Sequence, residues 1–238
     1  MSIAEKLIAI AENEKKVYDA GKEAGKNAEY DRFWDDYQQN GNRENCRAMF
    51  SGAGWDVNTF KPKHRMKPST NKAVFMFQFF NSENAEMIDY RNFKHLFDFS
   101  EITNGYGLFQ DARMDYIDID LSSATTILSC FSETYFPHQK THITLKTSDK
   151  CTNYSSAFAT CSALTDLFFA EGSVIATTID LKSCPLIKAS MTSVINALSS
   201  TTSGQTCTFK KTAKEAAFTE DEWDELIGTK PNWTFSLV

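Results

Sequence analysis

IDIDL at residues 117–121 is the stretch that decides the expected fold, and its pattern recurs as HITLK at 142–146 and TIDLK at 178–182. In each stretch apolar and polar residues alternate, which is the period-of-two pattern of a strand with one buried face. Polar turns rich in Ser, Thr and Asn separate such stretches from about residue 72 onward. The sequence therefore predicts a series of short strands joined by polar turns.

A phenylalanine in a setting of small residues stands before several of these strands. Phe109, Phe131 and Phe158 follow one another at intervals of 22 and 27 residues. A supersecondary unit of that length cannot bury its own apolar face, so neighbouring units are expected to stack. The fold class that we expect is α+β, with an N-terminal helix followed by a leucine-rich-repeat β-solenoid over residues 72–187.

The N-terminal part is expected to hold a helix over residues 1–40 and a turn-rich aromatic cap over residues 41–71. Residues 3–28 carry a narrow apolar seam between charged faces, as a coiled coil requires. We favour self-association through this seam into a homo-oligomer, because one stripe buries too little surface for a globular core helix. A helix packed on its own domain is the alternative. The seam consists of Ile3, Leu7, Ile10, Val17, Ala24 and Ala28.

The C-terminal part, residues 188–238, reads as a helix-strand cap. Two capping-box spacings occur here, Thr212 with Glu215 and Thr219 with Glu222. The second is expected to open a helix that ends at a glycine followed by a proline. The other expected elements are a helix over residues 188–200, a strand around 207–209 and a last strand over 233–237.

The tract from about residue 72 to the end resembles the irregular, BspA-like leucine-rich repeats of surface and prophage-encoded proteins of gut Firmicutes. The resemblance rests on AFATCSALTDLFF at 157–169, IDLKSCPL at 179–186, SVINAL at 193–198 and KPNWT at 230–234, with IAENEKKVYDAG at 10–21 resembling the helix that precedes such repeats. It implies a structural or recognition role, such as a phage tail accessory protein or an adhesin. It supplies no catalytic residues.

Composition narrows the function classes. The 25 basic and 31 acidic residues give a net charge of −6, which argues against nonspecific binding of nucleic acid. We expect no signal peptide, because residues 1–6 show neither a basic region nor an unbroken apolar run, and no membrane span, because no apolar run reaches about 18 residues. We therefore expect cytoplasmic synthesis, with virion association as a further possibility that the resemblance implies. The six cysteines are widely spaced without a Cys-x-x-Cys, so free buried thiols are expected rather than disulfides or zinc.

Candidate catalytic and metal-binding residues are few, and we expect no enzyme, metal or cofactor. Asp118 and Asp120 share a strand face about 6.6 Å apart, a spacing that suits Ca²⁺ or paired glycosidase carboxylates. A solvated strand face is the simpler interpretation, and a hydrolase is kept as a distant alternative. His138 and His142 are not expected to form a helical zinc pair, because Pro137 breaks a helix just before His138 and His142 begins a predicted strand.

The polar face of the predicted strands is the candidate binding surface, because stacked repeats commonly bind along such a face. Two roles are compatible with it. One is a virion or appendage component assembled through residues 3–28, and the other is a recognition module for a protein or glycan ligand. The candidate binding residues are Asp118, Asp120, His142, Thr144, Lys146, Asp180 and Lys182.

Overall fold

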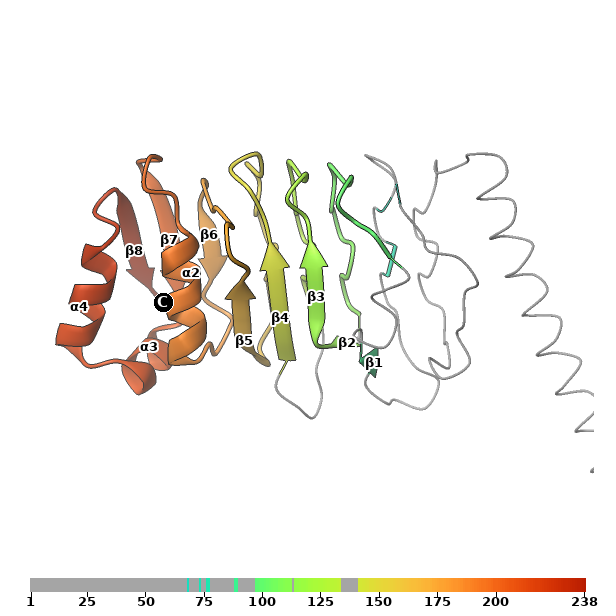
Figure 1. Cartoon of the computed structure of the whole chain (residues 1–238). Helices are drawn as coiled ribbons and strands as arrows, with labels where there is room; N and C mark the ends of the chain where they lie inside the picture. The colour runs from blue at the N-terminus through green and yellow to red at the C-terminus, as the bar shows by residue number, and fades with distance from the viewer. Residues whose placement is uncertain are drawn as a thin grey trace, which may run out of the picture. The chain divides into compact units, whose positions relative to one another are not determined.

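The structure is a computed structural model whose described part consists mainly of short parallel strands and three helices (Figure 1). The helix predicted over residues 1–40 lies outside the described residues, as does nearly all of the cap predicted over 41–71. Self-association through residues 3–28, and the appendage role that depends on it, therefore stay predictions. The described residues are 68, 73, 76–77, 88–89, 97–112, 114–133 and 141–238.

The described strands form three separate parallel sheets, and within each sheet the strands follow one another in chain order. The two-stranded sheet pairs β1 (Ile88–Asp89) with β2 (Met114–Asp115). The first three-stranded sheet contains β3 (Ile117–Asp120), β4 (Thr141–Lys146) and β5 (Leu164–Phe169). The second contains β6 (Ile179–Leu181), β7 (Gln205–Phe209) and β8 (Trp233–Leu237). The helices are α2 (Lys188–Ala197), α3 (Lys211–Ala217) and α4 (Glu220–Gly228).

The strands predicted from alternation are confirmed as β3, β4 and β6. Ile117 pairs with Ile143, which in turn pairs with Leu167, and all three side chains are fully buried. Because successive residues of a strand point to opposite faces, this register places the polar residues between them on the other side of the sheet. The parallel register thus produces one apolar face and one polar face in the β3–β4–β5 sheet.

Four phenylalanine rings form a stack within the core. Phe77, Phe109, Phe131 and Phe158 lie ring on ring, with successive centroids 5.2, 5.7 and 5.4 Å apart and interplanar angles of 3°, 6° and 9°. Each ring is no more than 1% exposed. Aromatic burial on this scale dominates the energetics of a core, so the stack is a main source of stability for this part of the chain.

The turns that carry the last three rings share an unusual backbone conformation. Two residues before and two residues after each phenylalanine, φ lies between +50° and +59°. For residues other than glycine, this left-handed conformation costs about 1–2 kcal/mol each, because Cβ approaches the following carbonyl oxygen. Backbone hydrogen bonds to the following turn, such as Phe109 N–H to Cys130 O (2.8 Å) and Phe131 N–H to Ala157 O (2.9 Å), offset that cost. The left-handed residues are Gly107, Asp111, Ser129, Glu133, Ser156 and Thr160.

The leucine-rich-repeat solenoid predicted for residues 72–187 is wrong. The strands form separate short parallel sheets, and β5 does not pair with β6. Helix α2 lies against β5 instead, and the hydroxyls of Ser190 and Ser193 accept hydrogen bonds from Leu167 N–H (3.0 Å) and Phe169 N–H (2.9 Å). These two N–H groups are the donors that a further strand would have needed, so the sheet ends at β5.

Ser190→Ala is expected to lower the free energy of unfolding by about 1–3 kcal/mol, because it leaves the N–H group of Leu167 buried without an acceptor. Ser190 and Leu167 are both 0% exposed, so water cannot replace the lost hydroxyl. Chemical denaturation of both proteins measures the difference. Thr192→Ala is the control, since the Thr192 hydroxyl bonds only to Lys188 O within the same helix. A loss no larger than that of the control would contradict the role assigned to Ser190.

The elements after residue 188 largely match their prediction. Helix α4 opens with the predicted capping box, in which the Thr219 hydroxyl and the Glu222 carboxylate each accept a backbone hydrogen bond. The capping box predicted for Thr212 and Glu215 is wrong. Helix α3 begins at Lys211, so its N-cap is Lys210 instead of Thr212, and no side chain caps it.

Candidate recognition surface

Polar side chains from neighbouring strands stand side by side on the outward face of the β3–β4–β5 sheet. Asp118 pairs in register with Thr144, and Asp120 pairs with Lys146, whose Nζ lies 3.5 Å from the carboxylate. The structure therefore brings together the candidate residues predicted on β3 and β4. We call the following set the outward face: Tyr116, Asp118, Asp120, His142, Thr144, Lys146, Asp166 and Phe168.

A row of rings crosses the outward face. The His142 ring lies between those of Tyr116 and Phe168, with centroid distances of 5.7 and 5.2 Å. Its Nε2 lies 3.0 Å from the Thr144 hydroxyl, which fixes the orientation of the imidazole. All four side chains are half-buried, so each keeps part of its surface in contact with solvent.

The sequence prediction missed Tyr116, Asp166 and Phe168. Tyr116 lies just before β3 in a bend with φ +52°, so the alternation of the strand does not determine where its ring lies. Strand β5 was also hard to interpret, because the register shifts at its start and the buried residues Leu164 and Leu167 are three positions apart instead of two. Because of that irregularity, the sequence of β5 does not alternate strictly, and alternation could not identify Asp166 and Phe168 as outward-facing residues.

Asp180 and Lys182 do not belong to this surface. Asp180 lies in β6, where it pairs with Thr208 of β7, and Lys182 follows that strand. The arrows of β6 and β8 run opposite to those of β3 and β4 in Figure 1. The prediction that Asp180 and Lys182 align with the polar residues of β3 and β4 is therefore wrong, because the strands belong to different sheets. Their own ion pair measures 2.8 Å.

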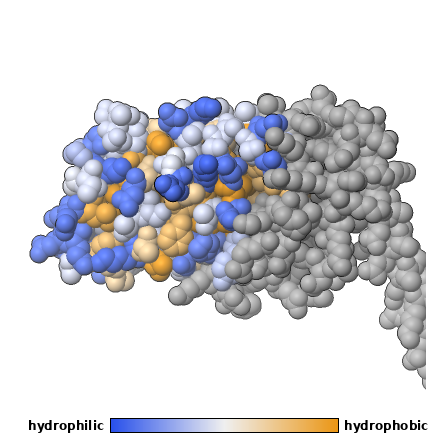
Figure 2. Space-filling model, in the orientation of Figure 1, coloured by the Kyte–Doolittle hydropathy of each residue, from blue (hydrophilic) through white to orange (hydrophobic). Residues whose placement is uncertain are grey.

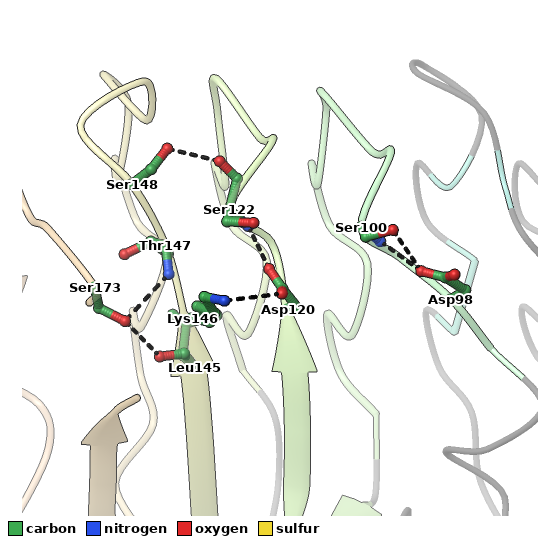
Figure 3. A network of polar contacts seen from close by, with 9 residues as sticks. All are labelled: Asp98, Ser100, Asp120, Ser122, Leu145, Lys146, Thr147, Ser148 and Ser173. Carbon is green, nitrogen blue, oxygen red and sulfur yellow. Dashed lines mark hydrogen bonds and ion pairs between the residues drawn. The ribbon is translucent and has the colours of Figure 1, made fainter. Parts of the chain in front are cut away.

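Polar side chains form hydrogen bonds in the turns that follow β3 and β4, and in a neighbouring turn at Asp98 and Ser100 (Figure 3). Asp98 accepts hydrogen bonds from the backbone and hydroxyl of Ser100, and Asp120 accepts one from Ser122 N–H at 2.9 Å. The Ser148 hydroxyl donates to Ser122 O at 2.6 Å, which connects one turn to the next. These side chains satisfy backbone groups that the turns leave open, which is the usual role of short polar residues in turns.

The ionisation of Asp120 bears on the alternative of a hydrolase. Burial disfavours its charged form, but hydrogen bonds from Ser122 and the charge of Lys146 outweigh burial, so the pKa of Asp120 is lowered. A glycosidase acid needs a raised pKa in order to hold its proton near neutral pH. Asp120 therefore does not suit the role of proton donor in a pair with Asp118.

A second carboxylate pair lies on the turns beside the phenylalanine stack, and the sequence prediction did not find it. Burial, together with the charge of Glu133 and a hydrogen bond to it, raises the pKa of Asp111. Both residues occupy left-handed positions of successive turns, which places one carboxyl group beside the other. In the described ranges, no group of three His, Cys, Asp or Glu side chains is arranged to hold a metal ion.

The cysteines within the described residues are free and buried, which confirms that part of the prediction; Cys46 lies outside these residues. Burial raises the pKa of Cys151 to about 11, and the Cys161 thiol donates to Phe131 O at 2.9 Å. Buried free cysteines behave as small apolar side chains. The set is Cys130, Cys151, Cys161, Cys184 and Cys207.

Hydrophilic and hydrophobic residues are interspersed over the side of the molecule that Figure 2 shows. Among the helices of the described residues, none is long and apolar enough to cross a membrane. No match was found when the chain was compared with protein-family models, with curated proteins and with solved structures. The outward face is therefore interpreted from its own chemistry.

Proposed function

We propose that this chain is a non-catalytic recognition module that binds a protein or glycan ligand along the outward face. The ring row is the observation that carries the proposal. It sets the His142 ring of β4 between Tyr116, which immediately precedes β3, and Phe168 of β5, with ring separations of 5.2–5.7 Å. Half-buried aromatic side chains beside a few polar groups are typical of binding surfaces, because they lose little conformational entropy when a ligand covers them.

The polar groups around the ring row support the same role. Thr144 offers a hydroxyl, Asp118 and Lys146 are exposed, and Asp120 is held by an ion pair to Lys146. The outward face thus presents a hydroxyl group, carboxylates and one ammonium group, all carried by strands. Fixed groups reduce the ordering that accompanies binding, and this favours recognition of an extended ligand.

The test is binding of the labelled full chain to a glycan array and to intact bacterial cells, before and after substitution. Lys146→Ala and His142→Ala are each expected to weaken saturable binding by about tenfold or more. Lys182→Ala is the matched control. Lys182 also pairs with an aspartate and is similarly exposed, at 55% against 45% for Lys146, but it belongs to the other sheet.

Two outcomes would contradict the proposal. One is saturable binding that survives the double variant His142→Ala, Lys146→Ala with unchanged affinity. The other is equal loss of binding in the Lys182→Ala control, which would place the ligand elsewhere. Circular dichroism of each variant shows whether the fold is retained.

A further inference from the structure

Helix α2 packs against β5, where a further strand of the β3–β4–β5 sheet would otherwise lie. A hollow remains between the helix and the end of β5. The end of β5, the turn after it and one face of α2 line this open hollow of about 360 Å³. Gly172 in this turn has φ +77°, a conformation that side chains disfavour, although a Cβ there would meet no atom within 4 Å. The hollow is lined by Phe169, Ala170, Glu171, Gly172, Ser173 and residues of α2.

Two side chains in the lining are available to a ligand. Within the described part of the chain, neither the exposed Glu171 carboxylate nor the exposed Asn196 amide has a hydrogen-bond partner. The Ser193 hydroxyl accepts one hydrogen bond, from Phe169 N–H, and keeps its own proton to donate, whereas the Ser173 hydroxyl already accepts from Thr147 N–H and donates to Leu145 O, both at 3.4 Å. Phe169 adds a half-buried ring. The hollow thus combines one ring surface with an amide, a carboxylate and hydroxyl groups.

This chemistry selects a class of ligand. No Lys, Arg or His lines the hollow, so a phosphate or other anion would lack a charged partner. One carboxylate, Glu171, is too few for Ca²⁺, which takes six to eight oxygen ligands. A volume of about 360 Å³ lies at the small end of ligand sites. A neutral ring compound with several hydroxyls can donate to the Glu171 carboxylate and the Asn196 carbonyl while its C–H face lies on Phe169.

The hollow adjoins the outward face. Ala170 N–H donates to Leu145 O at 2.9 Å, so Ala170 stands beside Lys146 and continues the row that begins at Asp120. On the far side, Lys230 Nζ donates to Asn196 O at 3.1 Å and holds the last turn of α2 in place. A chain of sugar residues that crosses the outward face can therefore enter the hollow at Ala170.

From these contacts we propose that the hollow between β5 and α2 binds one neutral sugar residue of a glycan, with Glu171 and Asn196 as its hydrogen-bonding partners and Phe169 as its apolar floor. This inference rests on the proposed function and identifies glycan as the ligand class. The side chains of Glu171 and Asn196 are exposed and make no internal contact that the fold needs. Both can therefore be replaced without loss of the fold.

The experiment is titration of the full chain with methyl glycosides of glucose, galactose and N-acetylglucosamine, followed by amide NMR. Shifts are expected at Gly172 and Ser193 with at least one glycoside. Asn196→Ala and Glu171→Gln should each weaken that binding by about tenfold, as expected for loss of one ligand hydrogen bond. Glu225→Gln, an exposed substitution on α4, is the control and should leave the affinity unchanged.

The outcomes separate this inference from the proposed function. If no glycoside shifts the amides of the hollow while glycan-array binding still depends on His142 and Lys146, the inference is overturned and the proposed function stands. Shifts produced by methylammonium alone would also overturn it, because they would indicate a cation site at Glu171. Shifts in the hollow that persist in His142→Ala, together with loss of array binding in Asn196→Ala, support both.

Discussion

Phe131→Ala is expected to lower the free energy of unfolding by about 3–5 kcal/mol, the largest effect that we predict for a single side chain. Phe131 is fully buried and lies in the interior of the stack, with Phe109 on one side and Phe158 on the other. The substitution removes apolar burial, leaves a cavity and breaks two ring contacts, each worth about 0.5–1.5 kcal/mol beyond the area buried. Chemical denaturation followed by tryptophan fluorescence and circular dichroism measures the loss.

Two comparisons make this prediction specific. Phe131→Leu fills most of the cavity and should retain a large part of the stability that Phe131→Ala loses. Phe235→Ala removes the same atoms from a half-buried position in β8 and should cost less. A loss below about 1 kcal/mol for Phe131→Ala would mean that the ring stack does not hold this part of the chain together.

Glu220→Gln is expected to lower the free energy of unfolding by about 2 kcal/mol, because it leaves a buried lysine without its counter-ion. The side chain of Lys214 is only 2% exposed, and its Nζ lies 2.5 Å from the Glu220 carboxylate and 5.9 Å from the centre of the Trp223 ring. Glu220 itself is 79% exposed, so solvent screens part of the ion pair and the effect stays below that of a fully buried pair.

The reverse substitution distinguishes charge from packing. Lys214→Met keeps an unbranched apolar side chain against Trp223 and removes the buried charge, so it should cost little or even stabilise the protein. Asp221→Asn is the control for the electrostatic effect of the helix terminus, because Asp221 also lies in the first turn of α4. Equal losses in Glu220→Gln and Asp221→Asn would show that the helix terminus, and not Lys214, is what Glu220 stabilises.

Local patterns predicted a substantial part of the described structure. Alternation located β3, β4 and β6, and the capping box at Thr219 and Glu222 located the start of α4. These features depend on interactions within a few residues, so the sequence contains them directly. Alternation also predicted which residues of β3 and β4 face outward, and Asp118, Asp120, Thr144 and Lys146 lie together as expected.

The sequence could not show which strands share a sheet. Residues 117–121 and 178–182 have nearly the same pattern, yet one strand pairs with β4 and the other with β7. The local pattern specifies which face of a strand is buried and carries no information on its neighbour. For that reason the alignment of Asp180 and Lys182 with the outward face was predicted wrongly.

By itself, then, the sequence determined the short strands, their buried faces and the helix caps. Only the tertiary structure decided where the first sheet ends, which polar residues share a surface and where the hollow beside β5 lies. The physical reason is that two serine hydroxyls of α2, 23 and 24 residues distant in sequence, take the edge N–H groups of β5. Whether a helix or a strand covers a sheet edge depends on the packing of the whole chain, so a local residue pattern cannot predict it.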